Sequence, residues 1–399
     1  MTSDLNVAFD ARHLTSKVLR GMDRYTVALV RELVKQGVKV TLFHRARESL
    51  NPVHIKDLGC SIVGLTDYSG LHWEQVVVPL ALLRGKFDLY HAPAERGVPL
   101  LAPCPVVFTI HSVTAHSYYE FVRSGLLPGS VKDYLGYDFN PYSRSFWNYL
   151  FRLQVSRSNH ILTPSDFCRN EVIQFLKVLP DKVTTTRLAV PAQFEKPSRL
   201  ESDQNTILKS FGIKRPYLLY VGGYEPHKNV KGLLKTFAIV KQKRSDLMLV
   251  LVGSKSIPEN LKEAASKLNL KVDLDVVFLK NLTDKLTDLY DSADLFVTMS
   301  WRETFCLPAL EAMTRGVPVI GSKWGAFSEV VGDAGQLVHP CLYENAADTI
   351  LKTLQSGNRQ FLSNLVREQA KIFNWEKTVK DTLNIYKTLT LSSTNALNL

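Results

Sequence analysis

Short apolar runs alternate with longer amphipathic stretches along almost the whole chain. Residues 5–9 form one such run, and residues 24–36 follow with apolar positions three and four apart, which predicts a strand and then a helix that ends at Gly37. Repeated alternation of this kind is typical of parallel sheets covered by helices on both faces. The other predicted strands are residues 38–43, 87–91, 106–110, 160–163, 182–188, 217–221, 247–252, 276–279, 295–298 and 317–321.

A polar stretch at residues 191–205 separates two such series and indicates a linker. We therefore predict an α/β protein with two doubly wound Rossmann-like domains, residues 1–195 and 205–374, that face a cleft. Ligands of doubly wound sheets lie at the carboxyl ends of the strands, so this cleft is the expected site. The last predicted helix, residues 375–390, can pack on either domain, and in the first case the chain would return to the N-terminal domain.

The formal net charge of the 399 residues is +11, but the chain has no Lys/Arg-rich run and no nucleic-acid module, so nucleic acid is not a predicted partner. Anionic sugar nucleotides or anionic lipids suit such a surface. Five cysteines without metal-site spacing indicate free thiols in a reducing compartment. With no signal pattern and no apolar stretch near the roughly 20 residues of a spanning helix, we expect a cytoplasmic protein, either soluble or peripheral on the inner face of the membrane.

Residues 118–152 contain eleven aromatic side chains mixed with basic ones. Two helices packed over the core would explain this composition and are the somewhat favoured interpretation. The alternative is a surface that contacts an acceptor or a membrane, because Tyr and Trp suit half-wet positions. On this second interpretation, residues 118–152 are the predicted place of a peripheral membrane contact.

Two carboxylates, Glu303 and Glu311, stand on either side of a tight turn. Pro308 falls in the first turn of a predicted helix that ends at Gly316, and a helix that begins there aims free backbone N–H groups and a positive helix end at one point. Such a point suits a phosphate, and the two carboxylates beside it can accept hydroxyl groups. The pattern predicts a site for a nucleotide sugar.

A glycine pair, Gly222 and Gly223, follows the predicted strand 217–221 and precedes Lys228. Glycines permit close backbone approach and the lysine can reach a phosphate, although a plain strand–helix turn would also explain the pattern. Because the ends of parallel strands meet at one edge of a sheet, we expect Lys228 and the helix after Glu303 to hold a diphosphate together.

In the first half, the Asp10–Arg12 stretch and the Gly21 loop with Arg24 could approach a ligand, or Arg24 could simply pair with Asp10 or Asp23 at the surface. His111 ends a strand that should point at the cleft, although a lone histidine is more often structural. The sequence has no Asp-x-Asp in a strand-end setting, so we predict no metal site and assign the charge of a leaving group to Lys228 and backbone amides.

These residues together resemble the family-4 retaining glycosyltransferases of the two-Rossmann-domain (GT-B) type. The most specific element is Glu303-x7-Glu311 followed by Ala-Met-Thr-Arg-Gly-Val-Pro-Val-Ile320. Supporting segments are residues 325–335, 289–297 and 162–165. The resemblance runs over nearly the whole chain and implies a hexosyltransferase that uses a nucleoside-diphosphate sugar and no other cofactor.

The resemblance also implies roles for individual residues. Glu303 would bind the sugar hydroxyls, Glu311 the ribose, and Lys228 the diphosphate. His111 would contact the donor sugar, which makes His111, Lys228 and Glu303 the predicted catalytic set. The other predicted donor-binding residues are Gly21, Met22, Gly222, Gly223, Asn281, Leu282, Thr304, Phe305, Cys306 and Leu307.

The chain departs from the family pattern at four positions. Cys306 stands where Gly is common, Gly223 where a basic residue is frequent, Ser112 where Asp is usual, and Asp23 in place of a second loop glycine. The lysine and both glutamates are present. We predict hexosyl transfer with retention, from UDP-glucose first or GDP-mannose second, to a saccharide or a lipid-linked saccharide. The alternatives are a weakened sugar-nucleotide-binding scaffold and a sugar-nucleotide epimerase.

Overall fold

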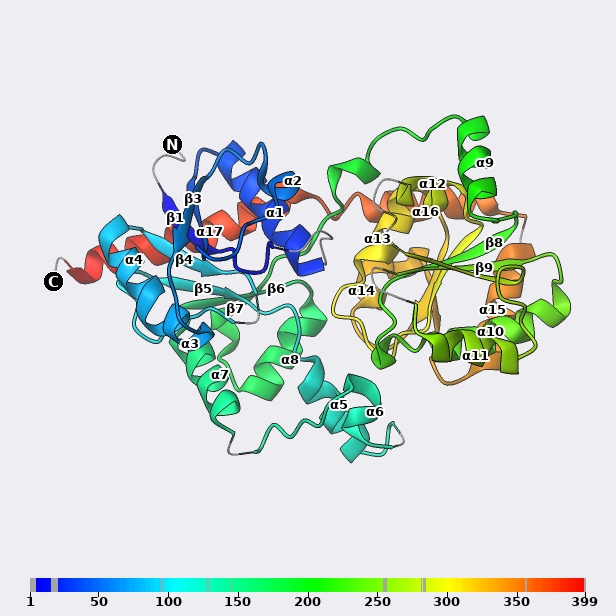
Figure 1. Ribbon diagram of the computed structural model, residues 1–399, viewed down its shortest axis with the longest axis horizontal. Helices are drawn as coiled ribbons and strands as arrows, with labels where there is room; N and C mark the ends of the chain where they lie inside the picture. The colour runs from blue at the N-terminus through cyan, green and yellow to red at the C-terminus, as the bar shows by residue number, and fades with distance from the viewer. Residues whose placement is uncertain are drawn as a thin grey trace. The chain divides into compact units, whose positions relative to one another are not determined.

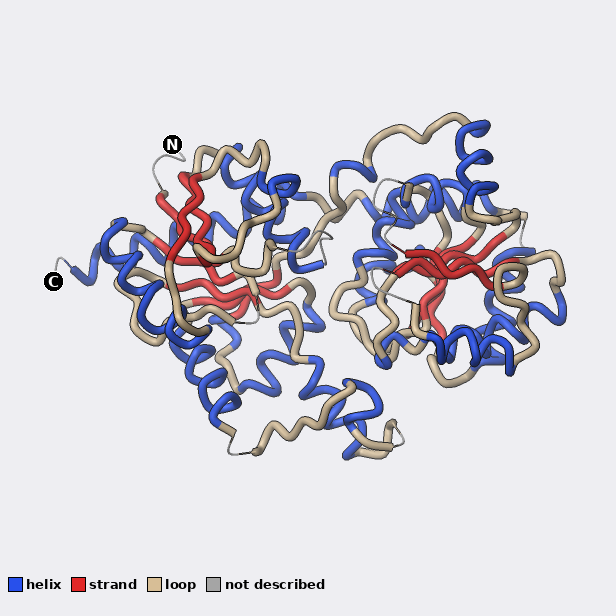
Figure 2. The backbone as a smooth tube through the Cα atoms, viewed as in Figure 1, coloured by secondary structure: helices blue, strands red, loops and turns tan. Residues whose placement is uncertain are grey.

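The computed structural model describes residues 5–15, 21–94, 96–127, 129–143, 145–253, 257–280, 282, 285–355 and 357–397. The chain divides into two compact units. Unit 1 comprises Met1–Ser117, Asn140–Ala189 and Asn374–Leu399, and unit 2 comprises Tyr118–Phe139 and Val190–Phe373. Each unit has a central sheet with helices on both faces, as Figures 1 and 2 show.

The sheet of unit 1 has seven parallel strands in the order β3-β2-β1-β4-β5-β6-β7. Val7 of β1 lies opposite Val40 on one side and Leu89 on the other, so β1 is central and the strand order reverses between β1 and β4. The strands are β1 (Asn6–Asp10), β2 (Lys39–Arg45), β3 (Ser61–Leu65), β4 (Leu89–Ala92), β5 (Val106–Thr109), β6 (His160–Thr163) and β7 (Val183–Thr185).

Helices cover both faces of this sheet because each presents one apolar stripe to it. In Figure 1, α1 and α17 lie on one face, and α4, α7 and α8 lie on the other. Trp73, Phe43 and Phe108 are among the fully buried side chains of the core on the second face. The helices are α1 (Gly21–Lys35), α2 (Pro52–Ile55), α3 (Gly70–His72), the π-helical turn η1 (Trp73–Val77), α4 (Val78–Gly85), α5 (Thr114–Arg123), α7 (Phe146–Arg157), α8 (Asp166–Leu176) and α17 (Trp375–Leu397).

The last helix, α17, packs within unit 1 against α1. The Tyr386 hydroxyl lies 2.5 Å from Nδ1 of His91, and both side chains are fully buried. The Thr378 hydroxyl donates to the carbonyl of Arg187 at the other end of the packed segment. Within the described part of the chain, every helix is too short or too polar to cross a bilayer.

Unit 2 has six parallel strands in the order β10-β9-β8-β11-β12-β13, which reverses between β8 and β11. Helices α10, α11 and α15 cover one face, and α12, α13 and α16 cover the other (Figure 1). The strands are β8 (Tyr217–Val221), β9 (Met248–Gly253), β10 (Val276–Lys280), β11 (Leu295–Thr298), β12 (Val319–Ser322) and β13 (Gln336–Val338). The helices are α6 (Val131–Leu135), α9 (Glu201–Ser210), α10 (Val230–Lys243), α11 (Glu259–Lys267), α12 (Leu286–Ser292), α13 (Leu307–Thr314), α14 (Phe327–Val331), α15 (Tyr343–Gln355) and α16 (Arg359–Ala370).

Residues 118–139 group with unit 2, whereas the sequence-based boundary at residue 195 placed them in the first domain. Tyr118 and Tyr134 stack with ring centroids 5.6 Å apart. Tyr134 packs edge-on against Trp301, and Phe121 contacts Trp324, so the segment shares a small aromatic cluster with the loops after β11 and β12. Aromatic packing therefore decides the assignment of this segment.

Candidate functional site in unit 2

The predicted Lys and Glu meet where the strand order of unit 2 reverses. Lys228 follows β8 and Glu303 follows β11, and these two strands are neighbours in the sheet. Nζ of Lys228 lies 3.0 and 2.9 Å from the two carboxylate oxygens of Glu303. The hydroxyl of Ser300 donates to Oε1 of the same carboxylate at 2.6 Å. The carboxyl ends of strands at such a switch point are where doubly wound sheets bind ligands.

Both members of this ion pair are charged at neutral pH. Burial disfavours each charge, but the attraction between the two groups outweighs it, so the pKa of Lys228 is raised and the pKa of Glu303 is lowered. The side chains are 22% and 12% exposed, so solvent and a ligand can still reach the pair. An ammonium has three donors, and those not directed at Glu303 can serve an anion.

Asn229 fixes the lysine loop to the loop that carries Glu303. Its Nδ2 donates to the carbonyls of Met299 at 2.9 Å and Pro340 at 3.1 Å, while its Oδ1 accepts from the Gly232 amide at the start of α10. Asn229 itself has φ +50°, a left-handed conformation that asparagine tolerates well. Sequence analysis missed this residue, although an asparagine directly before an apolar helical stripe is a recognisable N-cap signal.

The backbone of Glu303 is held by the loop after β12. The amide of Ala326 donates to the Glu303 carbonyl at 2.8 Å. Gly325 has φ +91°, and a Cβ at this position would lie only 2.5 Å from the Glu303 carbonyl oxygen. Both facts require glycine at this position, because only glycine lets the loop after β12 come this close to the backbone of Glu303.

Cys306 occupies the position before α13 with φ +77° and ψ +62°. A residue with a Cβ is strained in this left-handed region by roughly 1–2 kcal/mol, which gives a physical reason why glycine is common there in the family. Burial raises the pKa of the Cys306 thiol, so this side chain is neutral and does not act as a nucleophile at neutral pH. Phe305 and Cys306 are both buried, and Thr304 and Leu307 are half-buried around the first turn of α13.

Glu311, on α13, is fully buried and accepts a hydrogen bond of 2.9 Å from the hydroxyl of Tyr290. Tyr290 was not foreseen, because nothing in its sequence context marks it as a partner of Glu311. The predicted ribose contact of Glu311 stays a prediction.

The glycine turn after β8 packs on a tyrosine. The Tyr220 hydroxyl donates to the Gly223 carbonyl at 2.6 Å and would lie 2.7 Å from a Cβ placed on Gly222. The Glu225 carboxylate would lie 1.9 Å from a Cβ on Gly223. Leu282 lies in the loop after β10, half-buried, and Asn281 lies outside the described residues.

His111 follows β5 in unit 1. Its Nε2 lies 2.9 Å from the Pro93 carbonyl, so Nε2 carries the proton and donates, and Nδ1 is the acceptor nitrogen. Burial lowers the pKa of His111 to about 4, so the ring is neutral at neutral pH. Gly21 and Met22 form the first turn of α1, and Tyr25 of the same helix packs edge-on against the His111 ring.

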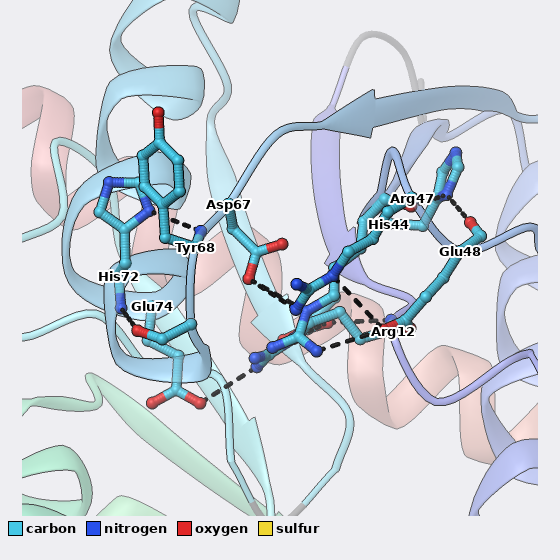
Figure 3. Close-up of polar contacts among 11 residues, drawn as sticks. Arg12, His44, Arg47, Glu48, Asp67, Tyr68, His72 and Glu74 are labelled. Carbon is cyan, nitrogen blue, oxygen red and sulfur yellow. Dashed lines mark hydrogen bonds and ion pairs between the residues drawn. The ribbon is translucent and has the colours of Figure 1, made fainter.

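Asp10 and Arg12 pair with each other rather than with Arg24. Arg12 donates to Oδ2 of Asp10 at 2.6 Å and to Glu74 at 3.1 Å. Figure 3 shows this network, with Glu74 directed at Arg12 and the buried Asp67 carboxylate directed at neighbouring guanidinium groups. The Asp10–Arg12 stretch therefore ties η1 to the end of β1. Within the described ranges, no three His, Cys, Asp or Glu side chains gather as a metal site.

Two Rossmann-like units with parallel sheets of seven and six strands form the GT-B fold, which solved glycosyltransferase structures share. Residues 203–371 match the family model of glycosyl transferases group 1, and residues 19–193 match that of glycosyltransferase family 4. The chain belongs to the group 1, family 4 glycosyltransferases.

O-antigen chain mannosyltransferase B of Escherichia coli is 34% identical over 233 residues, which are 57% of this chain and 60% of that relative. The match thus spans less than two thirds of its length. D-inositol 3-phosphate glycosyltransferase of Kribbella flavida is 26% identical over 406 residues, 93% of this chain and 91% of the relative. The structure of Anabaena Alr3699/HepE in complex with UDP and glucose has a TM-score of 0.75 at 16% identity, covers 97% of this chain and 100% of that one, and shows the shared fold.

Proposed function

We propose that the protein transfers a hexosyl group from a nucleoside-diphosphate sugar to a hydroxyl of a saccharide or a lipid-linked saccharide, with retention at the anomeric carbon and without a metal ion. The Lys228–Glu303 pair at the switch point of unit 2 carries this proposal. The pair supplies an ammonium group that can bind a diphosphate and a carboxylate that can bind sugar hydroxyls. These two groups are hydrogen-bonded to each other, so both ligand groups would be held at one place. UDP-glucose stays the first choice of donor and GDP-mannose the second.

The proposed reaction is a front-face substitution. The bond between the anomeric carbon and the diphosphate oxygen breaks, and the acceptor oxygen forms a bond to the same face of that carbon. The acceptor proton passes to an oxygen of the leaving diphosphate. Lys228 and the amides at the start of α13 stabilise the charge that develops on this leaving group. No protein side chain has to take the acceptor proton in this scheme.

His111 acts as a neutral hydrogen-bonding group in this proposal. Its Nε2–H is committed to the Pro93 carbonyl, so Nδ1 can only accept, and a donor-sugar hydroxyl is a suitable partner. Because burial lowers the pKa of His111 to about 4, its role should not change between pH 6 and 8. A protonated histidine has two N–H donors and no acceptor nitrogen, so it could not accept this hydrogen bond.

Two variants and a matched control test the proposal. Lys228→Ala should weaken donor binding by about 2 kcal/mol, or roughly thirtyfold, through the loss of one charge-assisted contact to a phosphate. Glu303→Ala should reduce turnover and should not weaken nucleotide binding. Lys231→Ala, an exposed lysine in the first turn of α10, should behave as the unmodified protein. Product formation and donor hydrolysis are measured with UDP-glucose and GDP-mannose.

Three results would contradict the proposal. Full sugar transfer by both Lys228→Ala and Glu303→Ala would show that the site lies elsewhere. Tight donor binding with neither hydrolysis nor transfer would favour the scaffold. Conversion of the donor sugar itself would favour the epimerase.

A further inference from the structure

We infer that a groove on unit 1, between η1 and α7, binds the apolar chain of an amphiphilic, lipid-linked acceptor with an anionic head group. The inference rests on the proposed function and names the class of acceptor. The groove is lined chiefly by Leu71, Val76, Leu100, Phe146, Tyr149 and Leu153 and has a volume of about 490 Å³. We refer to it as the η1–α7 groove.

The walls of the η1–α7 groove are mostly apolar, and several of the side chains that form them are exposed. Val76 is 42% exposed, Phe146 56% and Tyr149 64%. Leu71 at its edge is 36% exposed. A concave, mostly apolar site with a volume of several hundred Å³ is typical of pockets for small ligands.

Hydrogen bonds beside the groove tie η1 to α7 and to the segment that follows β4. Nε2 of Gln154 on α7 donates to Glu74 of η1 at 2.7 Å and to the Val98 carbonyl at 3.0 Å. Gln75 accepts from the Leu100 amide at 2.9 Å. Gln75 therefore lines the groove with its amide paired internally, and the Ser69 hydroxyl, also in the lining, accepts from the His72 amide at 3.2 Å. A preformed apolar slot binds a chain without first having to order its own walls.

The charges on the bordering helices favour an anionic head group. Helix α4 carries Arg84, and α7 carries Arg152 and Arg157, and neither helix has an Asp or Glu. All three arginines are exposed. Arg96 lies over the ring of Trp147, next to the groove residue Phe146. These arginines do not line the groove itself, but positive charge near it favours a phosphate or diphosphate head over a cationic one.

The groove adjoins the edge of the sheet where ligands of this fold are bound. Glu74, in η1, pairs with Arg12, which directly follows β1 at the carboxyl edge of the sheet. A chain held along η1 therefore places its head group at that edge. This continuity argues for the acceptor itself, in preference to an unrelated lipid or a second protein, as the occupant.

Alkyl phosphates are suitable probes, because they carry the inferred chemistry without a sugar. Each methylene that leaves water contributes about fourfold in affinity, so dodecyl phosphate would bind about two-hundredfold more tightly than octyl phosphate if all four extra methylenes were buried. In an open groove we expect at least tenfold. Calorimetry below the micellar concentration of each probe measures this ratio, and a negative heat-capacity change marks apolar burial.

Substitutions inside and outside the groove distinguish binding in the groove from binding elsewhere on the surface. Val76→Asp and Tyr149→Asp place a carboxylate in the wall and should lower the affinity for dodecyl phosphate at least tenfold. Leu83→Asp changes a side chain on α4 that is 60% exposed and does not line the groove, so it should retain the affinity within twofold. All three positions are exposed, and unchanged melting temperatures verify folding.

The outcomes for the inference and for the proposed function are distinct. No binding of dodecyl phosphate, or an equal loss in Leu83→Asp, overturns the inference. Binding of dodecyl phosphate without sugar transfer to any acceptor leaves the groove standing and rejects the proposed function. Where transfer occurs, Val76→Asp should raise KM for a long-chain acceptor at least tenfold and leave KM for its short-chain analogue unchanged. Equal KM changes for both acceptors also overturn the inference.

Discussion

Glu303 competes with a bound diphosphate for Lys228, and this competition leads to a counterintuitive prediction. Both carboxylate oxygens of Glu303 lie within 3.0 Å of Nζ of Lys228. A diphosphate must share or displace these contacts, and it also meets the negative charge of Glu303. Removal of that charge in Glu303→Gln should therefore tighten the binding of a bare nucleoside diphosphate while it reduces sugar transfer.

The size of the effect follows from the geometry. Two unit charges about 3 Å apart attract by about 5–6 kcal/mol at an effective dielectric constant of 20. Desolvation offsets most of this, and the side chains are 22% and 12% exposed, so about 1–2 kcal/mol is the expected net effect. The dissociation constant of UDP or GDP, whichever binds, should fall about five- to thirtyfold in Glu303→Gln.

Calorimetric titration of four proteins tests this reasoning: the unmodified chain, Glu303→Gln, Lys228→Met and the double variant. Lys228→Met keeps the packing of the stem and should weaken binding. Glu303→Gln should have little effect in the Lys228→Met background, because no ammonium is left to release. If Glu303→Gln weakens nucleotide binding as much as Lys228→Met does, the carboxylate supports the diphosphate site and the competition does not exist.

Three further predictions concern the support of the site and the pH dependence of folding. Asn229→Ala removes a helix cap and two interloop hydrogen bonds, and should lower the free energy of unfolding of unit 2 by about 2–4 kcal/mol in denaturant titrations. Gly325→Ala should lower the free energy of unfolding by about 2 kcal/mol or more and reduce sugar transfer, because the added Cβ would meet the Glu303 carbonyl. Gly357 also has a positive φ but lies in open space, so Gly357→Ala should lower the free energy of unfolding by only about 1 kcal/mol and leave transfer unchanged. Burial lowers the pKa of His91 from 6.5 to about 3, so the unfolded chain binds a proton in this interval that the native chain does not. Stability should therefore fall as the pH drops below about 6.5, by up to about 1.4 kcal/mol per pH unit for this group, and His91→Gln should flatten the slope in thermal unfolding.

The α/β class and the two Rossmann-like units could be predicted because buried parallel strands leave continuous apolar runs. Each predicted strand coincides with an observed one to within a few residues. The two strands that the pattern missed, β3 and β13, are at sheet edges. Most of β3 is exposed and β13 has three residues, so neither shows the apolar pattern that marks a buried strand.

The site was only partly accessible to sequence reasoning. That Lys228 and Glu303 would lie close together could be argued from strand topology, and the structure brings them into contact. Their role in donor binding stays a prediction. The N-cap role of Asn229 has a local signal, but its contact with the Met299 carbonyl does not, because Met299 lies far along the chain. The contact between Tyr290 and the Glu311 carboxylate likewise has no local signal.

For the aromatic segment 118–152, composition alone could not decide between packing over the core and an exposed contact surface. The packing interpretation holds for Tyr118 and Tyr134, which are buried in unit 2. The surface interpretation describes Phe146, Trp147 and Tyr149, which are at least half exposed on α7 of unit 1. Both parts of the segment are rich in aromatic residues, but their neighbours differ. Trp301 and Trp324 cover the first set, and nothing among the described residues covers the second to the same degree. A peripheral contact of this segment, if present, is therefore expected from α7 and the η1–α7 groove beside it and not from residues 118–139.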